Sequence, residues 1–492
     1  MRLHRSTIII LVLILALQVL LRLPFLHVPL ERDEGAYGYM AQRVLAGEMP
    51  YRDAFDHKPP LVYYTYAAFV KLFGNSIEAI RYPTLVYSLL STIALFYLGA
   101  LLWGSGIGLL AALFYAVFSG GVLIQGFTSN TETFMVLPLI LALIFFIKGQ
   151  EEKEEGLWYF YAGLFSGVAL MFKQVAVFNF LILFLLLFSR ESNRFNEVRL
   201  RFDLGRAGRL LLGSLLVPAC FLLYFTLRGA LPDLIHDVLL VNFKYLRSLE
   251  VPIPNRLVFG LIVTVFRANV ENSLVWLFGL LGVAYVLIKE RSRENLAVVL
   301  WALASLLGAM GSGLFFGHYY IQLMPALCLL SALAVGRVAR ETGLLLKVAL
   351  VAVSIFLIWK IVPYQYPFYL QYSPDQISEH QQGKNSYVLD RRLADDFKRF
   401  LKPQETLLVW PANPQLYFYL NKKAPTRYYN YLQWMEDEAV RAEVVGSILA
   451  NKPDYIVWTL YGFPYPELVE LIKKEYRLFM MIDKWKVFKR IK

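Results

Sequence analysis

Long apolar runs alternate with short polar stretches over most of this chain. A membrane-spanning helix needs about 20 apolar residues, and about eleven runs approach that length. We expect spans at approximately 7–27, 82–102, 107–123, 131–148, 157–172, 175–189, 210–227, 271–288, 296–313, 321–336 and 345–362. The pattern therefore predicts a polytopic α-helical membrane protein.

The first apolar run is similar to a signal peptide, because Arg2 and Arg5 precede it. No small-x-small cleavage site follows, and the chain continues directly into Arg22 and Leu23. We therefore expect an uncleaved first span, with the N-terminus on the inner side.

Lysine and arginine then fall mainly in loops on the inner side, as the positive-inside rule requires. They gather at 190–209, 289–293 and 337–340. An odd number of spans places the C-terminus outside. The expected location is a cytoplasmic membrane, with long outer segments at 28–81, 228–270 and 363–492.

The last outer segment loses the membrane-like composition from about residue 375. Its apolar pattern predicts helices at about 389–401, 433–450 and 466–475, short strands at 406–410 and 454–459, and a hairpin or long strand at 476–489. We expect a transmembrane domain at 1–362 and a small extracytoplasmic α/β domain at 363–492.

Composition supports a membrane class and argues against nucleic acid as a partner. Hydrophobic residues make up 58% of the chain and charged residues 17%, against about a quarter charged in soluble domains. The net charge of +12 comes from short loops between apolar runs. Cys220 and Cys328 lie inside apolar segments, so we expect no disulfide framework.

The first outer loop, residues 28–81, concentrates the polar chemistry. Transfer of a sugar between membrane-bound partners needs a base for the acceptor hydroxyl and cations for a lipid phosphate leaving group. Asp33 and Glu34 could serve as base, and Lys58, with Arg52 nearby, could hold the phosphate. The alternative is that these are solvated charges on an ordinary outer loop.

Charged and aromatic residues also stand at the ends of apolar runs. They are Arg81, Glu132, Lys173 and the stretch His318-Tyr319-Tyr320, and the predicted topology places all of them near the outer boundary. Ionisable groups at membrane depth are costly and usually functional or paired. Snorkelling side chains and an interfacial aromatic belt are the alternative.

His57 is a candidate metal ligand, because Asp56, His318 or Glu132 could complete a zinc site with it. No stretch has the local spacing of a metal motif. We therefore favour a hydrogen-bonded or phosphate-facing histidine, and we predict no metal site.

The motif Asp33-Glu34-Gly35-x-Tyr37 is followed by Gly47-x-x-Pro50-Tyr51-x-Asp53 and Asp56-His57-Lys58-Pro59-Pro60-Leu61. It resembles the GT-C fold glycosyltransferases of the protein O-mannosyltransferase and lipid A aminoarabinose transferase type. Thr131-Glu132, Lys173-Gln174 and His318-Tyr319-Tyr320 with Pro325 extend the resemblance over roughly residues 1–362.

The resemblance implies an inverting glycosyltransferase that uses a dolichyl- or undecaprenyl-phosphate sugar. Asp33 would be the base or would orient the acceptor, Glu34 would support it, and Lys58 would contact the donor phosphate. Residues expected to line the donor cavity are Lys173, Arg81, His318 and Tyr319, with His57, Asp56, Glu132, Tyr37, Tyr320 and Arg247 as further candidates. The expected partners are the lipid-linked donor, a protein, lipid or glycan acceptor, and membrane lipids. No cofactor is expected.

The chain departs from the aminoarabinose transferases at two places. They carry a histidine and arginines after the seventh span, where this chain has Asn242, Lys244 and Arg247, with His236 a little earlier. They carry glutamate directly before Lys-Pro-Pro, where this chain has His57. Neither the zinc pair of that subgroup nor aminoarabinose as the sugar therefore follows from the resemblance.

Two other classes are possible. A transporter or lipid flippase usually has inverted repeats and broken helices at mid-membrane, and this sequence has no visible repeat. A scaffold or receptor whose C-terminal domain binds a partner would leave the charged cluster of the first outer loop unexplained.

Overall fold

The computed structural model describes residues 4–491 except 152–154, 193–197, 248–252, 269–270, 312, 342, 384–386, 460–464 and 484. The contacts divide the chain into two units. The first contains residues 1–26, 82–221 and 251–372, and the second contains residues 27–81, 222–250 and 373–492. Residues 28–81, which keep the name first outer loop from their expected position, thus belong to the same unit as residues 222–250 and the C-terminal residues.

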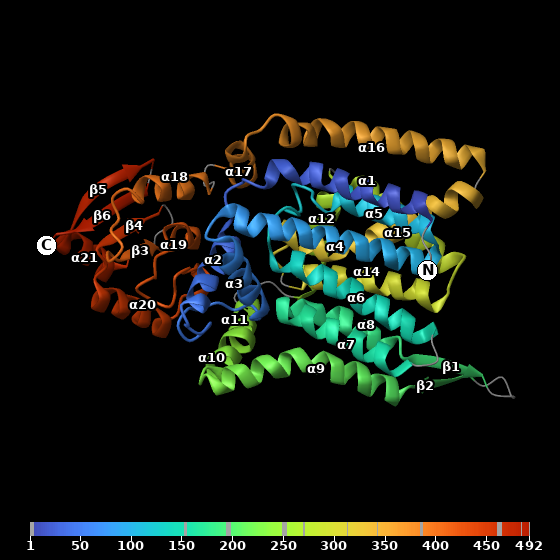
Figure 1. The fold of residues 1–492 in the computed structure, drawn as a ribbon, viewed down its shortest axis with the longest axis horizontal. Coiled ribbons are helices and arrows are strands. Elements are labelled where there is room, and N and C mark those ends of the chain that lie inside the picture. Colours follow the sequence, from blue (N-terminus) through green and yellow to red (C-terminus); the bar gives the residue numbers. More distant parts are fainter. Residues whose placement is uncertain are drawn as a thin grey trace. The chain divides into compact units, whose positions relative to one another are not determined.

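The first unit is built from apolar helices (Figure 1). They are α1 (Arg5–Arg22), η1 (Leu23–Phe25), α4 (Ile77–Trp103), α5 (Ser105–Phe118), α6 (Thr131–Glu151), α7 (Glu155–Phe172), η2 (Gln174–Ala176), α8 (Val177–Leu185), α9 (Leu204–Leu227), α12 (Ile253–Ala268), α13 (Ser273–Ile288), α14 (Arg293–Met310), η4 (Gly317–Leu323), α15 (Met324–Glu341) and α16 (Leu344–Leu370). Strands β1 (Phe188–Ser192) and β2 (Val198–Phe202) form an antiparallel hairpin before α9.

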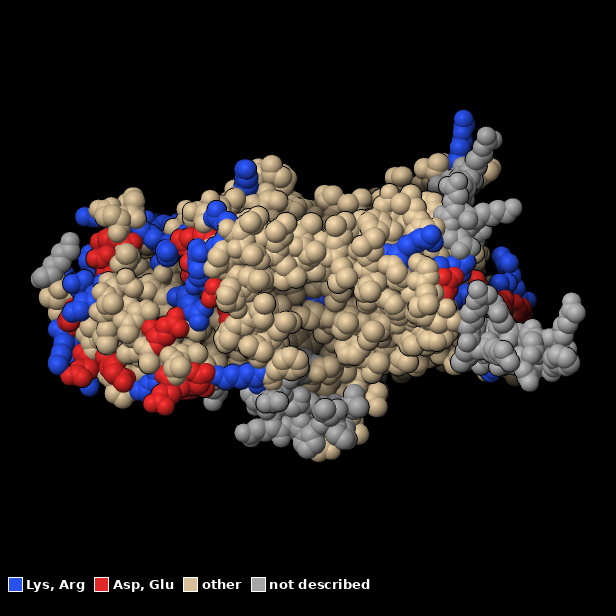
Figure 2. All heavy atoms as spheres, turned by 90° about the horizontal axis from the view of Figure 1, so that it is seen from below, with Lys and Arg blue, Asp and Glu red and all other residues tan. Residues whose placement is uncertain are grey.

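Seven helices in the described part of the chain are long and apolar enough to cross a membrane. The face of these helices seen in Figure 2 carries few charged side chains. Helix α16 is the clearest case, because only 6% of its most apolar window is buried and Trp359 is 69% exposed. Exposed apolar surface of this extent marks a face that meets a membrane or a partner, and helices of spanning length favour the membrane. The chain is therefore a multi-pass membrane protein.

All eleven predicted spans fall on helices, and four of them fall on the shorter apolar helices α5, α7, α8 and α13. The predicted span 175–189 is wrong at its end, because α8 stops at Leu185 and β1 begins at Phe188. The predicted span 107–123 also ends early, at Phe118, before a loop that contains Gly120 and Gly121. Helix α12 lies in a segment expected to be an outer loop.

Small residues let α7 and α9 approach closely. A Cβ added at Gly163 would lie 2.0 Å from the carbonyl oxygen of Leu210, and one at Gly213 would lie 2.1 Å from that of Phe160. Close backbone approach through small residues is a common way for helices to associate in a membrane.

The second unit combines helices with a four-stranded sheet. Its helices are α2 (Arg32–Leu45), α3 (Leu61–Phe73), α10 (Leu231–Ile235), η3 (His236–Leu240), α11 (Val241–Arg247), α17 (Pro374–Gln382), α18 (Val388–Phe397), α19 (Pro414–Leu420), η6 (Gln433–Met435), α20 (Glu438–Asn451) and α21 (Pro466–Glu475). The strands β3 (Leu407–Trp410), β4 (Tyr455–Trp458), β5 (Tyr476–Ile482) and β6 (Trp485–Arg490) lie in the order β3-β4-β6-β5. Only β3 and β4 are parallel. The predicted α/β fold of the C-terminal residues is confirmed.

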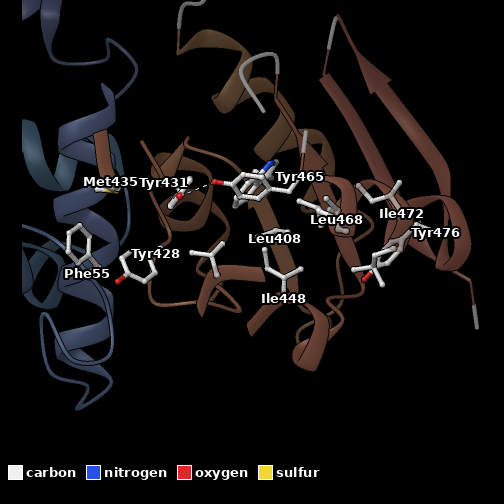
Figure 3. Packing of buried hydrophobic residues seen from close by; sticks show 14 of the residues in the cluster. Phe55, Leu408, Tyr428, Tyr431, Met435, Ile448, Tyr465, Leu468, Ile472 and Tyr476 are labelled. Carbon is white, nitrogen blue, oxygen red and sulfur yellow. Dashed lines mark hydrogen bonds between the residues drawn. The ribbon is translucent and has the colours of Figure 1, made fainter. Parts of the chain in front are cut away.

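The core of the second unit is aromatic and reaches into the first outer loop (Figure 3). Leu408 lies on β3 and Ile456 on the neighbouring strand β4. Tyr465 donates a hydrogen bond to Tyr431 at 2.9 Å. Phe55 of the first outer loop packs against Tyr428, with ring centroids 5.0 Å apart. The C-terminal residues therefore help to fix the conformation of the first outer loop.

Candidate active site

Helix α2 starts at Arg32, because Glu31 and Glu34 form a capping box. The Glu31 side chain accepts a hydrogen bond from the backbone of Glu34, and the Glu34 side chain accepts one from the backbone N–H of Glu31 at 3.1 Å. Asp33 and Glu34 therefore both lie in the first turn, where negative charge is favourable.

Glu34 is fully buried and forms a two-pronged ion pair with Arg81. Its Oε1 lies 2.6 Å from Nη1 of Arg81, and its Oε2 accepts from Nη2 at 2.8 Å. Arg81 is only 2% exposed. Both groups are thus engaged with each other, which ties the first turn of α2 to residue 81 of the same unit. The role of Arg81 at the donor phosphate stays a prediction.

Asp33 is positioned differently from its neighbour. Its Oδ2 lies 3.5 Å from Nζ of Lys58, and the two side chains are 22% and 15% exposed. Lys58 also lies over the Tyr37 ring, 5.0 Å from its centroid. The structure therefore brings together the three predicted residues Asp33, Lys58 and Tyr37. The carboxylate and the ammonium group are partly accessible, and the ammonium group lies over the tyrosine ring.

The backbone of Lys58 is fixed by two tyrosines. Its carbonyl oxygen accepts hydrogen bonds from Tyr51 at 2.7 Å and from Tyr63 at 3.3 Å. Pro59 and Pro60 follow, and α3 begins at Leu61. Proline restricts the residue before it to extended conformations. The backbone at Lys58 is therefore held in one conformation.

His57 points into an aromatic setting. Its ring lies 5.1 Å from that of Trp434 and 5.5 Å from that of Tyr245. Its backbone N–H donates to Asp56 Oδ1 at 2.7 Å, and its carbonyl accepts from Asn242 at 2.7 Å. Among the described residues, no three His, Cys, Asp or Glu side chains are grouped as a metal site would require.

Two further charges of the loop are held locally. Arg52, expected near Lys58, donates to Asp53 at 2.9 and 3.0 Å. Hydrogen bonding from Arg52 lowers the pKa of the Asp53 carboxyl below its usual value.

Arg247, another predicted cavity residue, ends α11, and its side chain lies outside the described part of the structure.

Several residues that hold this cluster carry no motif in the sequence. Arg427 donates to the carbonyl of Tyr51 at 3.1 Å, and its own carbonyl accepts from the N–H of Phe55 at 2.9 Å. Asn242 and Trp434 contact His57, as described above. These residues are distant in the chain, so only an expectation that the C-terminal residues pack on the first outer loop could have found them.

A second polar cluster lies within the first unit. Glu132, 1% exposed at the start of α6, forms an ion pair with Lys173 and accepts from Thr131 Oγ1 at 2.8 Å. Lys173 stands in the extended break between α7 and η2, with its Nζ 4.0 Å from the centroid of the Tyr319 ring.

The histidine of this cluster is also held. His318 Nδ1 lies 2.9 Å from Gln125 Oε1, and its ring packs against that of Tyr319 at 4.8 Å. The hydroxyl of the remaining candidate, Tyr320, is 2.8 Å from Thr264 Oγ1. These four residues therefore form one group, in which Glu132 and His318 are buried and Lys173 and Tyr319 are partly exposed.

Comparison with known proteins identifies the fold. The structure is similar to that of ArnT from Cupriavidus metallidurans bound to undecaprenyl phosphate, with a TM-score of 0.65, 15% identity and 98% of each chain covered. It is also similar to the oligosaccharyltransferase AglB from Archaeoglobus fulgidus in complex with an inhibitory peptide and a dolichol-phosphate, with a TM-score of 0.52 and 14% identity. That match covers 92% of this chain and 69% of the archaeal one.

The sequence comparisons are narrower. Residues 57–203 match the family of dolichyl-phosphate-mannose-protein mannosyltransferases. A comparison of this sequence with those of characterised proteins finds no significant match. The expected resemblance to GT-C fold glycosyltransferases is confirmed by the fold and by the family match together.

Proposed function

We propose that this protein, which has the GT-C fold, is an inverting glycosyltransferase that moves a sugar from a polyprenyl-phosphate donor to an extracytoplasmic acceptor. The observation that carries the proposal is the Asp33–Lys58 pair, which sets a partly accessible carboxylate 3.5 Å from a partly accessible ammonium group. The similar structures are complexes with undecaprenyl phosphate and with a dolichol-phosphate, which supports this donor class.

In the proposed reaction Asp33 takes the proton of the acceptor hydroxyl as the acceptor oxygen attacks the anomeric carbon. The bond between that carbon and the phosphate oxygen breaks, and the electron pair leaves with polyprenyl phosphate. Lys58 stabilises the added negative charge on the departing phosphate. A single displacement inverts the anomeric carbon.

The other predicted residues keep supporting roles. Lys173, His318 and Tyr319 are proposed to line the donor cavity, as the cluster in the first unit supplies a cation and two aromatic groups. Glu34 with Arg81 is proposed to hold the first turn of α2, and thereby Asp33, in place. The proposed location is a cytoplasmic membrane with the N-terminus inside.

The donor class is tested by mass spectrometry of the lipids and glycans of a strain that lacks this protein. The proposal predicts an accumulated polyprenyl-phosphate sugar and a glycan that has lost the same sugar. Re-expression of the wild-type chain should reverse both changes. An unchanged lipid pool would contradict the proposal, and accumulation on the wrong side of the membrane with no transferase activity of the purified protein would favour a flippase.

A further inference from the structure

The connection between α5 and α6, residues 119–130, is buried for almost its whole length in the first unit. Only Leu123 and Gln125 are partly exposed. Loops usually lie on the surface, because a buried loop must satisfy its backbone polar groups inside the protein. Two buried ionisable side chains form these hydrogen bonds: Arg22, which precedes the loop in the sequence, and Glu271, which follows it.

Glu271 satisfies backbone donors of the loop. It is fully buried just before α13, and its carboxylate accepts from the N–H groups of Val122 and Leu123, the latter at 2.6 Å. Gln365 of α16 donates to the same carboxylate at 2.9 Å. Successive backbone N–H groups that converge in this way make a site suited to a carboxylate.

Arg22 satisfies acceptors of the same loop. It is 7% exposed at the end of α1, and its guanidinium donates to the carbonyl of Gly126 and to Ser119 Oγ, the latter at 3.1 Å. It also reaches Ser88 Oγ of α4 at 3.4 Å. The Glu271 carboxyl group thus holds the middle of the loop, and the Arg22 guanidinium holds Ser119 and Gly126 on either side of it.

Two glycines allow both side chains to come this close. A Cβ at Gly120 would lie 2.8 Å from Cζ of Arg22, and one at Gly121 would lie 2.6 Å from the carboxyl carbon of Glu271. A side chain at either position would therefore force the flexible end of Arg22 or Glu271 to move. The Gly120-Gly121 pair and the two charged residues therefore form one fitted arrangement.

The loop contacts His318 of the second polar cluster through Gln125. Gln125, whose φ of 51° is unusual for a residue with a side chain, places its Oε1 2.9 Å from Nδ1 of His318. A Cβ at Gly317 would lie 2.2 Å from the carbonyl oxygen of Leu123, so the loop also touches the residue before His318. Glu132 begins the helix that follows the loop.

We propose that Arg22 and Glu271 are positioning residues that hold this loop so that Gln125 fixes the ring orientation and the tautomer of His318. With Oε1 of Gln125 as acceptor, the ring proton lies on Nδ1, and Nε2 is the nitrogen that can accept. The inference rests on the proposed role of His318 in the donor cavity.

The test compares Glu271→Gln with Glu290→Gln, which makes the same change at the opposite end of α13, where Glu290 pairs with Arg337. The amide of Glu271→Gln would turn a donor toward backbone donors. We expect faster hydrogen exchange in the peptide spanning 119–130 and a fall in kcat of about 10- to 100-fold. We also expect the pH profile of kcat to change in Glu271→Gln, and to change in the same way in a second variant, Gln125→Ala. Glu290→Gln should match the wild type in all three measurements.

Hydrogen exchange is measured without substrate, so it tests the loop even if no sugar transfer is found and the proposed function fails. Unchanged exchange in Glu271→Gln would overturn the inference. Faster exchange with a wild-type pH profile would also overturn it, because the loop contacts would then be structural only. If Glu271→Gln does not fold, Gln365→Leu, which removes one donor to the carboxylate, should show the same changes more weakly, and wild-type behaviour in that variant would count against the inference.

Discussion

At the scale of single residues, two adjacent carboxylates have different surroundings. Glu34 is fully buried against Arg81, whereas Asp33 is 22% exposed beside Lys58. Neighbouring positions on a helix point about 100° apart. Glu34 therefore points toward the protein interior, and Asp33 does not. The sequence could identify the pair as chemically important, but it could not separate the two roles, because that requires knowing which side of α2 is packed.

Glu34→Gln should destabilise the protein. The change leaves the Arg81 guanidinium buried without a counter-charge, and loss of one member of a buried pair costs about 3–5 kcal/mol. Thermal unfolding of the purified protein should show a lower midpoint. Glu470→Gln, at an exposed pair with Lys474, should have little effect, and equal midpoints for both variants would contradict the assignment of Glu34.

Asp390 should make stability depend on pH. It is fully buried in α18 and accepts hydrogen bonds from Asn413 and Gln415, and burial raises its pKa to about 8. The folded state then holds a proton that the unfolded state releases above about pH 4. Its contribution to stability is complete below that pH and is lost as the pH rises toward 8.

Asp390→Asn resembles the protonated carboxyl in shape and cannot ionise. The variant and the wild type should therefore unfold at similar temperatures near pH 4, and the variant should be the more stable one at pH 8. Tryptophan fluorescence, which includes Trp410 of the same unit, can follow the transition. A difference that does not grow with pH would show that this carboxyl is ionised in the folded protein.

At the scale of elements, most helices and strands were predictable, and the start of α2 was not. The C-terminal strands and the helix at 466–475 follow simple apolar patterns. Helix α2 begins with glutamate as its N-cap, which is not a favoured capping residue, and it contains Gly35, which usually weakens a helix. Gly35 is there because a Cβ would lie 2.6 Å from the backbone of Gln415. Long-range packing, which a local pattern cannot contain, explains this residue.

Gly35→Ala should force α2 away from α19 and displace Asp33, which lies two residues earlier. We expect lower thermal stability together with a loss of sugar transfer. Gly446→Ala is the matched control, because Gly446 lies in α20 with nothing within 4 Å of an added Cβ, and alanine should stabilise that helix slightly. Wild-type activity and stability in Gly35→Ala would show that this contact does not position α2.

At the scale of the whole molecule, the apolar pattern was sufficient for the fold class. The length of each apolar run can be read directly from the sequence, and all eleven predicted spans fall on helices. The grouping of residues 27–81 with the C-terminal residues could not be predicted in this way. It depends on contacts such as Phe55 with Tyr428 and Arg427 with Tyr51, which join positions more than 370 residues apart.

The central claim is that the Asp33 carboxylate accepts the proton of the acceptor beside Lys58. The most direct measurement is the rate of sugar transfer from a purified polyprenyl-phosphate donor by Asp33→Asn in lipid vesicles, together with donor binding and thermal stability. Asp395→Asn, on an exposed face of α18, is the control. The account predicts a loss of at least about 100-fold in rate for Asp33→Asn, with donor binding and stability retained and the control unaffected. Transfer by Asp33→Asn at the wild-type rate would contradict it.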